Sequence, residues 1–258
     1  MSFILSKRID SVLILSLNRP EVFNSFNRLM ALELQEILDD AELDEEVRCI
    51  VITGIGKAFS AGQDLQEVTD PKGPSLPTIL GEHYNPIIKR IRYIEKPIIA
   101  AVNGVAAGAG ANIALACDVV LASSVSSFIQ AFSKIGLIPD SGGTFFLPRL
   151  IGFQRASALS MLGDKISAVD AEKMGMVYKV IEENVFMDEV EKLAITLSQM
   201  PTIALGFIKK ALNRSMFNDL ESQLEVEEVL QTQAGQTYDY KEGVQAFIEK
   251  RKPVFKAK

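Results

Sequence analysis

Two stretches of small residues constrain the fold of this chain more than any other feature of its sequence. The first is Phe59-Ser60-Ala61-Gly62-Gln63-Asp64-Leu65, and the second runs from Asn103 to Asn112 and reads NGVAAGAGAN. Each follows an apolar, β-branched run and precedes a helix-like run. The pattern predicts two strand-to-helix turns whose bare backbone N–H groups can bind developing negative charge.

Strand and helix patterns alternate along most of the chain, which predicts an α/β layered fold with crossover connections. The expected elements are a hairpin over 2–7 and 11–17, strands over 47–54, 97–102 and 118–122, and helices over 27–44, 84–94 and 109–117. Only helical patterns follow, over 201–216, 219–234 and 240–250. We therefore expect a core over 1–199 and a helical oligomerisation segment over 200–258, whose apolar faces need a partner.

Composition excludes several classes of function. The 258 residues are 48% hydrophobic and 23% charged, as in a folded soluble protein. The net charge of −6 and the lack of a long Lys/Arg run argue against nucleic acid as a partner. No apolar run approaches the ~20 residues that span a bilayer, and no leader pattern is present, so we expect no membrane association and a cytoplasmic location.

The potential metal ligands are few. Cys49 and Cys117 lie in apolar contexts and are expected to be buried and reduced. His83 is the one histidine, and it is expected at the surface beside a flexible Pro/Gly/Ser-rich loop. With no cysteine cluster, we expect no metal site.

Each candidate site residue also has a structural interpretation. Gly62 can serve a positive φ angle and Asp64 can cap a helix. Gly108 and Gly110 share a first helical turn, although each glycine costs about 0.8–1.0 kcal/mol relative to alanine in a helix. Either a ligand approaches this turn or another element packs closely against it. Asp140 follows Pro139 and precedes Ser-Gly-Gly, so it is either a turn residue or an acid that works beside the bound charge.

Two other acidic features favour structural interpretations. Asp118 follows a helix end, where an acid opposes the helix dipole, so a salt bridge is expected there. The acid-rich stretch 221–228 is expected to be a solvated helix face.

Several motifs, taken in order, resemble the enoyl-CoA hydratase/isomerase (crotonase) family from about residue 3 to 255. They are Leu17-Asn18-Arg19-Pro20, Phe59 to Leu65, Lys96-Pro97 with Ala100 to Gly104, Ala116-Cys117-Asp118, Gly136 to Pro139, Gly142-Gly143-Thr144 and Arg155-Ala156. The resemblance implies a spiral of ββα repeats with a helical C-terminal trimerisation segment, assembled as a homotrimer or a dimer of trimers. It also implies acyl-CoA thioester substrates, with coenzyme A as part of the substrate rather than a cofactor.

The resemblance assigns roles to the two turns. The backbone N–H groups of Gln63 and Ala109 form an oxyanion hole around the thioester oxygen. The segment of Ala61, Gly62, Gln63, Asp64 and Leu65 lines the coenzyme A site, largely through backbone atoms. The substrate-binding positions on the other side are Gly108, Ala109, Asn112 and Phe132.

The chain departs from the family pattern where the hydratases carry two glutamates. Asn112 and Phe132 stand at those positions, and neither can act as an acid or base. Asp140 remains, at or near the place where several isomerases of the family carry their carboxylate. Its apolar surroundings, Ala131, Phe132, Ile135, Leu137 and Ile138, are expected to raise its pKa.

The resemblance therefore implies an acyl-CoA isomerase that needs no metal, nucleotide or flavin, with weak or absent hydration of crotonyl-CoA. It is strongest to the isomerases that convert ring-1,2-epoxyphenylacetyl-CoA to oxepin-CoA in bacterial phenylacetate catabolism. The acyl pocket is expected to be lined partly by Phe132 and a mobile 70–84 segment. A general Δ3,Δ2-enoyl-CoA isomerase, a weak enoyl-CoA hydratase and a non-catalytic acyl-CoA-binding oligomer remain open.

Overall fold

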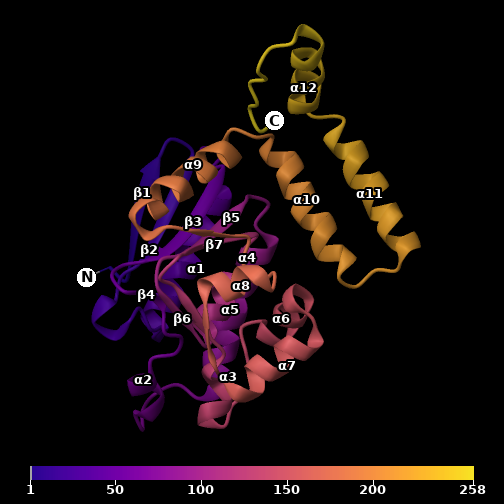
Figure 1. The fold of residues 1–258 in the computed structure, drawn as a ribbon. Coiled ribbons are helices and arrows are strands. Elements are labelled where there is room, and N and C mark those ends of the chain that lie inside the picture. Colours follow the sequence, from indigo (N-terminus) through magenta and orange to yellow (C-terminus); the bar gives the residue numbers. More distant parts are fainter. Residues whose placement is uncertain (1) are drawn as a thin grey trace.

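A computed structural model of the chain describes residues 2–258 (Figure 1). It opens with the predicted hairpin, in which β1 (Ile4–Ile9) pairs antiparallel with β2 (Val12–Leu17). Asp10, at the tip, has a positive φ of 49°.

Successive strand pairs divide between two sheets. The strands β3 (Cys49–Gly54), β5 (Ile98–Val102), β7 (Val119–Ser123) and β10 (Lys179–Ile181) join the hairpin in a sheet of order β1-β2-β3-β5-β7-β10. The strands β4 (Ala58–Ser60), β6 (Val105–Ala107), β8 (Ser127–Ile129) and β9 (Lys165–Ser167) form the second sheet in that order. Each of the pairs β3/β4, β5/β6 and β7/β8 thus gives one strand to each sheet, which confirms the expected spiral of ββα repeats.

Helices and short helical turns separate or flank these strand pairs. Their bounds are α1 (Arg28–Leu43), α2 (Leu65–Thr69), α3 (Leu76–Thr78), the π-helix η2 (Ile79–Tyr84), α4 (Asn85–Tyr93), α5 (Ala109–Leu115), α6 (Gly143–Ile151), α7 (Phe153–Leu162), α8 (Ala168–Lys173) and α9 (Phe186–Ser198), with 3₁₀ turns η1 (Pro20–Val22), η3 (Ala131–Ile135) and η4 (Glu183–Val185). The start of α1 follows from its cap, because the Met30 N–H donates to Asn27 Oδ1 at 2.9 Å.

The large sheet is covered on both faces. In β3, Ile50 and Ile52 face the main core while Cys49 and Val51 face a second cluster that α9 covers. A strand buried on both faces reads as a continuous apolar run, as this one does. Cys49 and Cys117 are both buried free thiols, as the sequence predicts.

Three helices, α10 (Thr202–Ser215), α11 (Leu220–Ala234) and α12 (Tyr238–Glu249), project from this body as the sequence predicts (Figure 1). Asp219 and Thr237 cap the last two. Between α10 and the body, Lys209 Nζ lies 2.8 Å from Asp118 Oδ2, and Arg92 Nη1 lies 3.2 Å from Asp118 Oδ1. Asp118 is therefore salt-bridged, as expected, whereas the division at residue 200 into separate units stays a prediction.

The segment before α4 differs from the expected mobile loop. Residues 76–84 are helical, through α3 and the π-helix η2. His83 is 1% exposed, so its predicted surface location is wrong. The cause is a tertiary contact, because the α1 side chain of Gln35 donates to the backbone carbonyls of Glu82 and His83. Among residues 2–258, no helix combines the length and apolar character needed to cross a membrane.

Candidate active site

The first predicted turn presents the backbone N–H of Gln63. Phe26 and Gln63 form a parallel bridge, in which the Phe26 N–H donates to Gly62 O at 2.7 Å and the Asp64 N–H donates to Phe26 O at 2.9 Å. These bonds use the groups on either side of Gln63, so its own N–H points away from Phe26. This N–H donates to no group within residues 2–258, which leaves it available to a substrate oxygen.

The second turn presents the N–H of Ala109, the first residue of α5. The first N–H groups of a helix have no intrahelical acceptor, and that of Ala109 has no other partner in the described chain. Gly108 before it has φ +53° and ψ −129°, a conformation that side chains disfavour.

The two glycines of this turn serve different purposes. A Cβ on Gly110 would lie 2.6 Å from Ser60 O, so that glycine allows α5 to pack closely on β4. A Cβ on Gly108 would meet only Phe132 Cζ, at 3.8 Å. Close packing therefore explains Gly110, and backbone conformation explains Gly108.

Gly62 brings the two turns into contact. Its φ is +88°, and a Cβ there would lie 2.9 Å from Ala107 O and 3.2 Å from Ala109 N. Any side chain at this position would push the turns apart. The glycine thus places the predicted donors, the N–H groups of Gln63 and Ala109, beside one another.

Asp140 lies in the loop between η3 and α6, close to the same helix end. Asn112 Nδ2 donates to the backbone oxygen of Asp140 at 2.8 Å. Asn112 follows Ala109 by three residues, about one turn along α5, so the loop is bonded to a side chain of the first turns of that helix. The structure therefore brings the acid loop to the N-terminal turn of α5.

The pKa of Asp140 is raised above its ordinary value, as predicted, chiefly because burial disfavours the charged carboxylate. A hydrogen bond opposes this shift, since Ser141 Oγ donates to Asp140 Oδ1 at 2.8 Å. The predicted apolar wall is wrong in part. Ile135 is 58% exposed and Ile138 is 79% exposed, because η3 ends at Gly136 in the left-handed conformation and the chain turns outward.

Asn112 and Phe132, which replace the two glutamates of the hydratases, are both buried. Both ends of the Asn112 amide have protein partners: Oδ1 accepts from Gln130 Nε2 at 2.8 Å, and Nδ2 donates to Asp140 O. The ring of Phe132 borders the open side of Gly108. Their predicted contacts with substrate stay predictions.

The remaining predicted residues belong to the first turn. Asp64 is the cap of α2, accepting from the Gln66 N–H at 3.0 Å, and it pairs with Arg19 Nη2 at 2.8 Å. Its structural interpretation is thereby confirmed. Ala61 and Leu65 are exposed on either side of it, and their predicted contacts with coenzyme A stay predictions.

Sequence reasoning missed Tyr84 as a member of this site. Tyr84 is 1% exposed, and its hydroxyl donates to Gln63 Oε1 at 2.9 Å. Gln63 Nε2 in turn donates to Glu67 Oε2 at 2.9 Å. Burial raises the pKa of the Tyr84 hydroxyl, and the negative charges of Asp140, Glu67 and Asp64 add to the shift. No local pattern indicates this role, because Tyr84 lies on η2, 21 residues from its partner.

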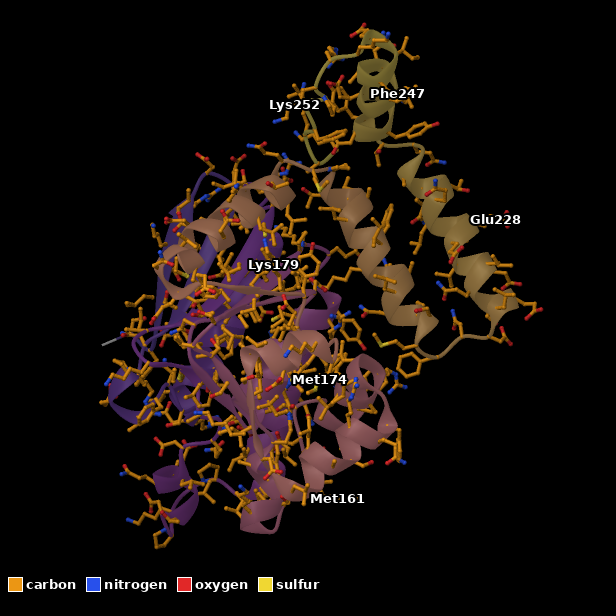
Figure 2. All side chains as sticks on the ribbon, viewed as in Figure 1. Met161, Met174, Lys179, Glu228, Phe247 and Lys252 are labelled. Carbon is orange, nitrogen blue, oxygen red and sulfur yellow. The ribbon has the colours of Figure 1, made fainter. Side chains whose placement is uncertain are left out.

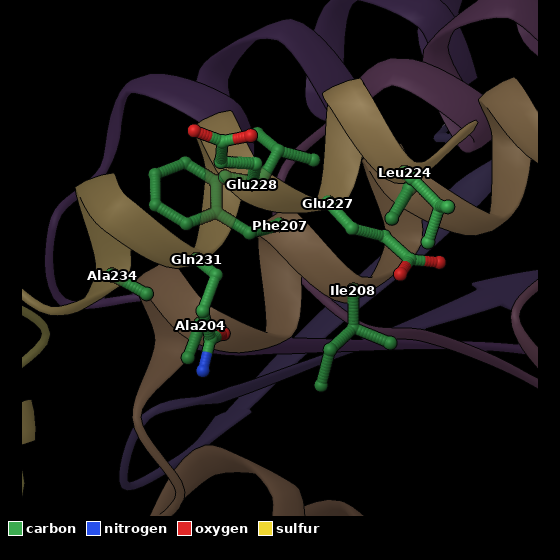
Figure 3. A pocket seen from close by; sticks show the side chains of 10 residues that line it. Ala204, Phe207, Ile208, Leu224, Glu227, Glu228, Gln231 and Ala234 are labelled. Carbon is green, nitrogen blue, oxygen red and sulfur yellow. The ribbon is translucent and has the colours of Figure 1, made fainter. Parts of the chain in front are cut away.

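A groove of about 570 Å³ lies elsewhere, between α10 and α11 (Figure 3). Phe207 and Ile208 of α10 face Leu224 of α11 across it, with Glu227 and Glu228 at its edge (Figure 3). It contains none of the predicted site residues. Within residues 2–258, no three His, Cys, Asp or Glu side chains are grouped as metal ligands would be.

The order of motifs, the two turns and the acid loop agree with a comparison against known families. The model of the enoyl-CoA hydratase/isomerase family matches residues 7–258. The chain belongs to this family of enzymes.

Relatives within the enoyl-CoA hydratase/isomerase family include proteins named for both kinds of reaction. The chain is 46% identical over 261 residues to the 1,2-epoxyphenylacetyl-CoA isomerase of Escherichia coli K12, covering 100% of both chains. It is 43% identical to a probable enoyl-CoA hydratase of Rhodobacter capsulatus, over 95% of both chains. The crystal structure of an enoyl-CoA hydratase from Bacillus anthracis has a TM-score of 0.92 at 32% identity, covering 99% of this chain and 100% of that one. The predicted crotonase fold is confirmed.

Proposed function

We propose that this protein is an acyl-CoA isomerase with one carboxylate base, Asp140, and an oxyanion hole formed by the N–H groups of Gln63 and Ala109. The observation that carries the proposal is the convergence at the start of α5. Two backbone donors without acceptors in the described part of the chain lie there beside the loop of a partly buried acid with a raised pKa.

The mechanism follows from the chemistry of a thioester. A proton next to a thioester is too weakly acidic for a carboxylate unless the enolate oxygen is stabilised as it forms. The two N–H groups and the start of α5 supply that stabilisation, and a single donor of this kind is typically worth about 2.7–4 kcal/mol. Asp140 removes the C2 proton and returns it elsewhere on the conjugated system, acting first as base and then as acid.

Hydration is disfavoured by the residues that stand at the two glutamate positions of the hydratases, Asn112 and Phe132. The Asn112 amide cannot accept a proton from water, and both of its ends already have protein partners. Phe132 fills the second position with a buried ring. The proposed reaction needs no metal or organic cofactor, since a carboxylate and backbone dipoles carry out every step.

We assign ring-1,2-epoxyphenylacetyl-CoA as the first substrate to test, with 3-enoyl-CoA isomerisation as a related activity. The likeness to the Escherichia coli isomerase over the full length of both chains supports this order. Both reactions begin with loss of the proton next to the thioester. We further propose a homotrimer or a dimer of trimers, supported by the exposed apolar side chains of α11 and α12.

The deciding experiment compares Asp140→Asn with the wild type on the ring epoxide and on 3-hexenoyl-CoA. The substitution keeps the side-chain volume and removes the base, so kcat should fall by about 100- to 10,000-fold. The exposed Asp164 is the matched control, and Asp164→Asn should retain wild-type turnover. An Asp140→Asn variant with wild-type turnover would refute the mechanism, and a large preference for the aliphatic thioester would reverse the substrate order. Binding of both thioesters without turnover would favour the acyl-CoA-binding oligomer.

A further inference from the structure

The loop that carries Asp140 is held by a pair of buried amide side chains. Asn112 is 0% exposed and Gln130 is 3% exposed. Gln130 Nε2 donates to Asn112 Oδ1 at 2.8 Å, and Asn112 Nδ2 donates to the Asp140 backbone oxygen at 2.8 Å. These two hydrogen bonds, which we call the relay, connect Gln130, directly after β8, through Asn112 on α5 to the backbone oxygen of Asp140.

Chemistry fixes the direction of this relay. A backbone carbonyl can only accept, so Asn112 must turn its NH₂ group toward Asp140 and its oxygen toward Gln130. Gln130 must then donate through Nε2. Its own oxygen, Gln130 Oε1, is buried without a hydrogen-bond partner in the described chain. An unsatisfied buried acceptor costs about 1–3 kcal/mol. The Gln130 amide is therefore oriented by the need of Asn112 Oδ1 for a donor, although this orientation leaves Gln130 Oε1 without one.

Gly143 allows the loop to come this close. A Cβ at this position would lie 2.3 Å from Asn112 Nδ2 and 2.7 Å from the Asn112 side-chain carbonyl carbon. The Gly143 N–H donates to the same Asp140 oxygen at 2.8 Å. That oxygen therefore accepts one bond from its own loop and one from α5.

We propose that Asn112 and Gln130 are positioning residues for the isomerisation, which hold the Asp140 peptide against the helix that presents the Ala109 N–H. The inference rests on the proposed function. It gives Asn112 a purpose other than substrate contact or acid–base chemistry. Because α5 carries both the Asn112 side chain and the Ala109 N–H, the relay fixes the position of Asp140 relative to that N–H.

The backbone of Asp140 determines where its carboxylate can lie. An aspartate side chain has only two rotatable bonds, and its end is held by Ser141 Oγ. Ser141 has a positive φ of 50°, so a shift of the preceding peptide would also move this hydroxyl. Misplacing a reacting group by 1 Å can cost about 100-fold in rate.

The test uses Asn112→Leu, which keeps the approximate volume of the side chain and removes both hydrogen bonds. Its kcat should fall by about 10- to 100-fold, with KM changed far less. Gln130→Met should give a smaller loss in the same direction, because Gln130 acts through Asn112. Asn213→Leu is the matched control, since Asn213 Nδ2 also donates to a backbone oxygen, that of Arg92, but at the junction of α10 and α4.

A second readout separates positioning from stability. A loosened Asp140 gains access to water, so its carboxyl should titrate at lower pH than in the wild type, both in the acid limb of kcat/KM and in a carboxyl ¹³C NMR titration. The Ser141 hydroxyl acts on this titration because its hydrogen bond favours the carboxylate, whereas the charge of Asp140 itself raises the pKa of the buried Tyr84 phenol. Loss of folded protein alone would lower the rate without moving either midpoint.

Unchanged kcat and unchanged midpoints in Asn112→Leu and Gln130→Met would overturn the inference, as would a rate loss with unmoved midpoints. If Asn112→Leu does not fold, Gln130→Met decides alone. Failure of the proposed function is distinguishable, because the wild type would then turn over neither thioester while the NMR titration would still report the position of Asp140.

Discussion

At the scale of single residues, burial sets the acidity of Asp140 and couples it to stability. Its folded-state pKa is raised above its ordinary value, so the folded protein binds this proton more tightly than the unfolded chain. The resulting stabilisation is complete below the unfolded pKa of about 3.8 and is lost as pH rises through the folded pKa.

Asp140→Asn should therefore be more stable than the wild type at pH 7, although we expect its turnover to be far lower. Thermal unfolding measured at a series of pH values from 7 downward should show the difference in stability between the variant and the wild type narrowing as pH falls toward the ordinary pKa of an aspartate. In the wild type, kcat/KM should rise with pH as Asp140 loses its proton, with a midpoint above 3.8, the ordinary value for the group. A variant less stable than the wild type at pH 7 would contradict a net cost of keeping this partly buried carboxylate charged.

Tyr84 holds the side chain of Gln63 through a hydrogen bond, and we expect it to affect the rate through this contact. Tyr84→Phe removes one hydrogen bond worth about 0.5–1.5 kcal/mol, so kcat should fall by roughly two- to tenfold if the Gln63 peptide depends on it. Tyr93→Phe is the control, because Tyr93 lies on the neighbouring helix and is 70% exposed. Steady-state kinetics on both variants checks this, and equal rates would leave Tyr84 a packing residue.

The residues of the site differ in how far sequence could predict them. Gly62 and Gly108 follow local rules, because a turn between a strand and a helix needs positive φ angles. Tyr84 and Gln130 act on partners brought close by the fold, and nothing next to them in the sequence indicates the contact. The sequence shows Asn112 as a departure from the family pattern, but the hydrogen bond of Asn112 to the Asp140 loop depends on how that loop folds over α5.

At the scale of elements, α10 is joined to the body by a buried ion cluster. The Lys209 side chain is 6% exposed and contacts Asp118, whereas the pair formed by the next residue, Lys210, with Glu95 is about half exposed on both sides. Removing one partner of a buried pair is strongly destabilising, but an exposed pair contributes about 0–1 kcal/mol.

Lys209→Met should therefore lower the free energy of unfolding by about 3 kcal/mol. Arg92 keeps part of the charge of Asp118 compensated, which limits the loss. The neighbouring Lys210→Met should change stability by less than about 1 kcal/mol. Urea unfolding of both variants measures the difference, and equal effects would show that the cluster does not anchor the helix.

The elements themselves follow the sequence closely where capping and periodicity act locally. Asp219 and Thr237 cap α11 and α12 close to the predicted starts. The π-helix η2 was not predicted, because its form depends on contacts such as the hydrogen bonds from Gln35 on α1. The same contacts bury His83, which a local reading of the proline-rich loop places at the surface.

At the scale of the whole molecule, the C-terminal helices carry apolar side chains that this chain alone does not cover. Phe247 on α12 is 85% exposed, and Leu220 and Leu224 on α11 are 68% and 54% exposed. Figure 2 places Phe247 on the projecting helices and Met161 on α7, at the far end of the body. Because exposed apolar groups of this kind favour burial, we propose that these helices form the interface of the proposed trimer.

Phe247→Asp should lower the mass of the proposed trimer in analytical ultracentrifugation, because a charge there opposes burial in an interface. Phe153→Asp is the matched control, since Phe153 is 76% exposed but lies on α7. It should leave the trimer intact. A wild-type monomer at micromolar concentration, or equal dissociation by both variants, would contradict assembly through these helices.

The contact of Gly62 with Ala107 and Ala109 has a consequence for how new reactions can arise on this scaffold. The two proposed oxyanion donors cannot be adjusted one at a time, because any side chain at Gly62 would move both turns. The acid sits on a separate loop that α5 holds through a single side chain. Directed evolution toward other thioester chemistry should therefore leave the donor pair and the loop glycines Gly136, Gly142 and Gly143 untouched and vary residues 137–141. A change of acid there should alter the reaction and spare the proposed enolate binding.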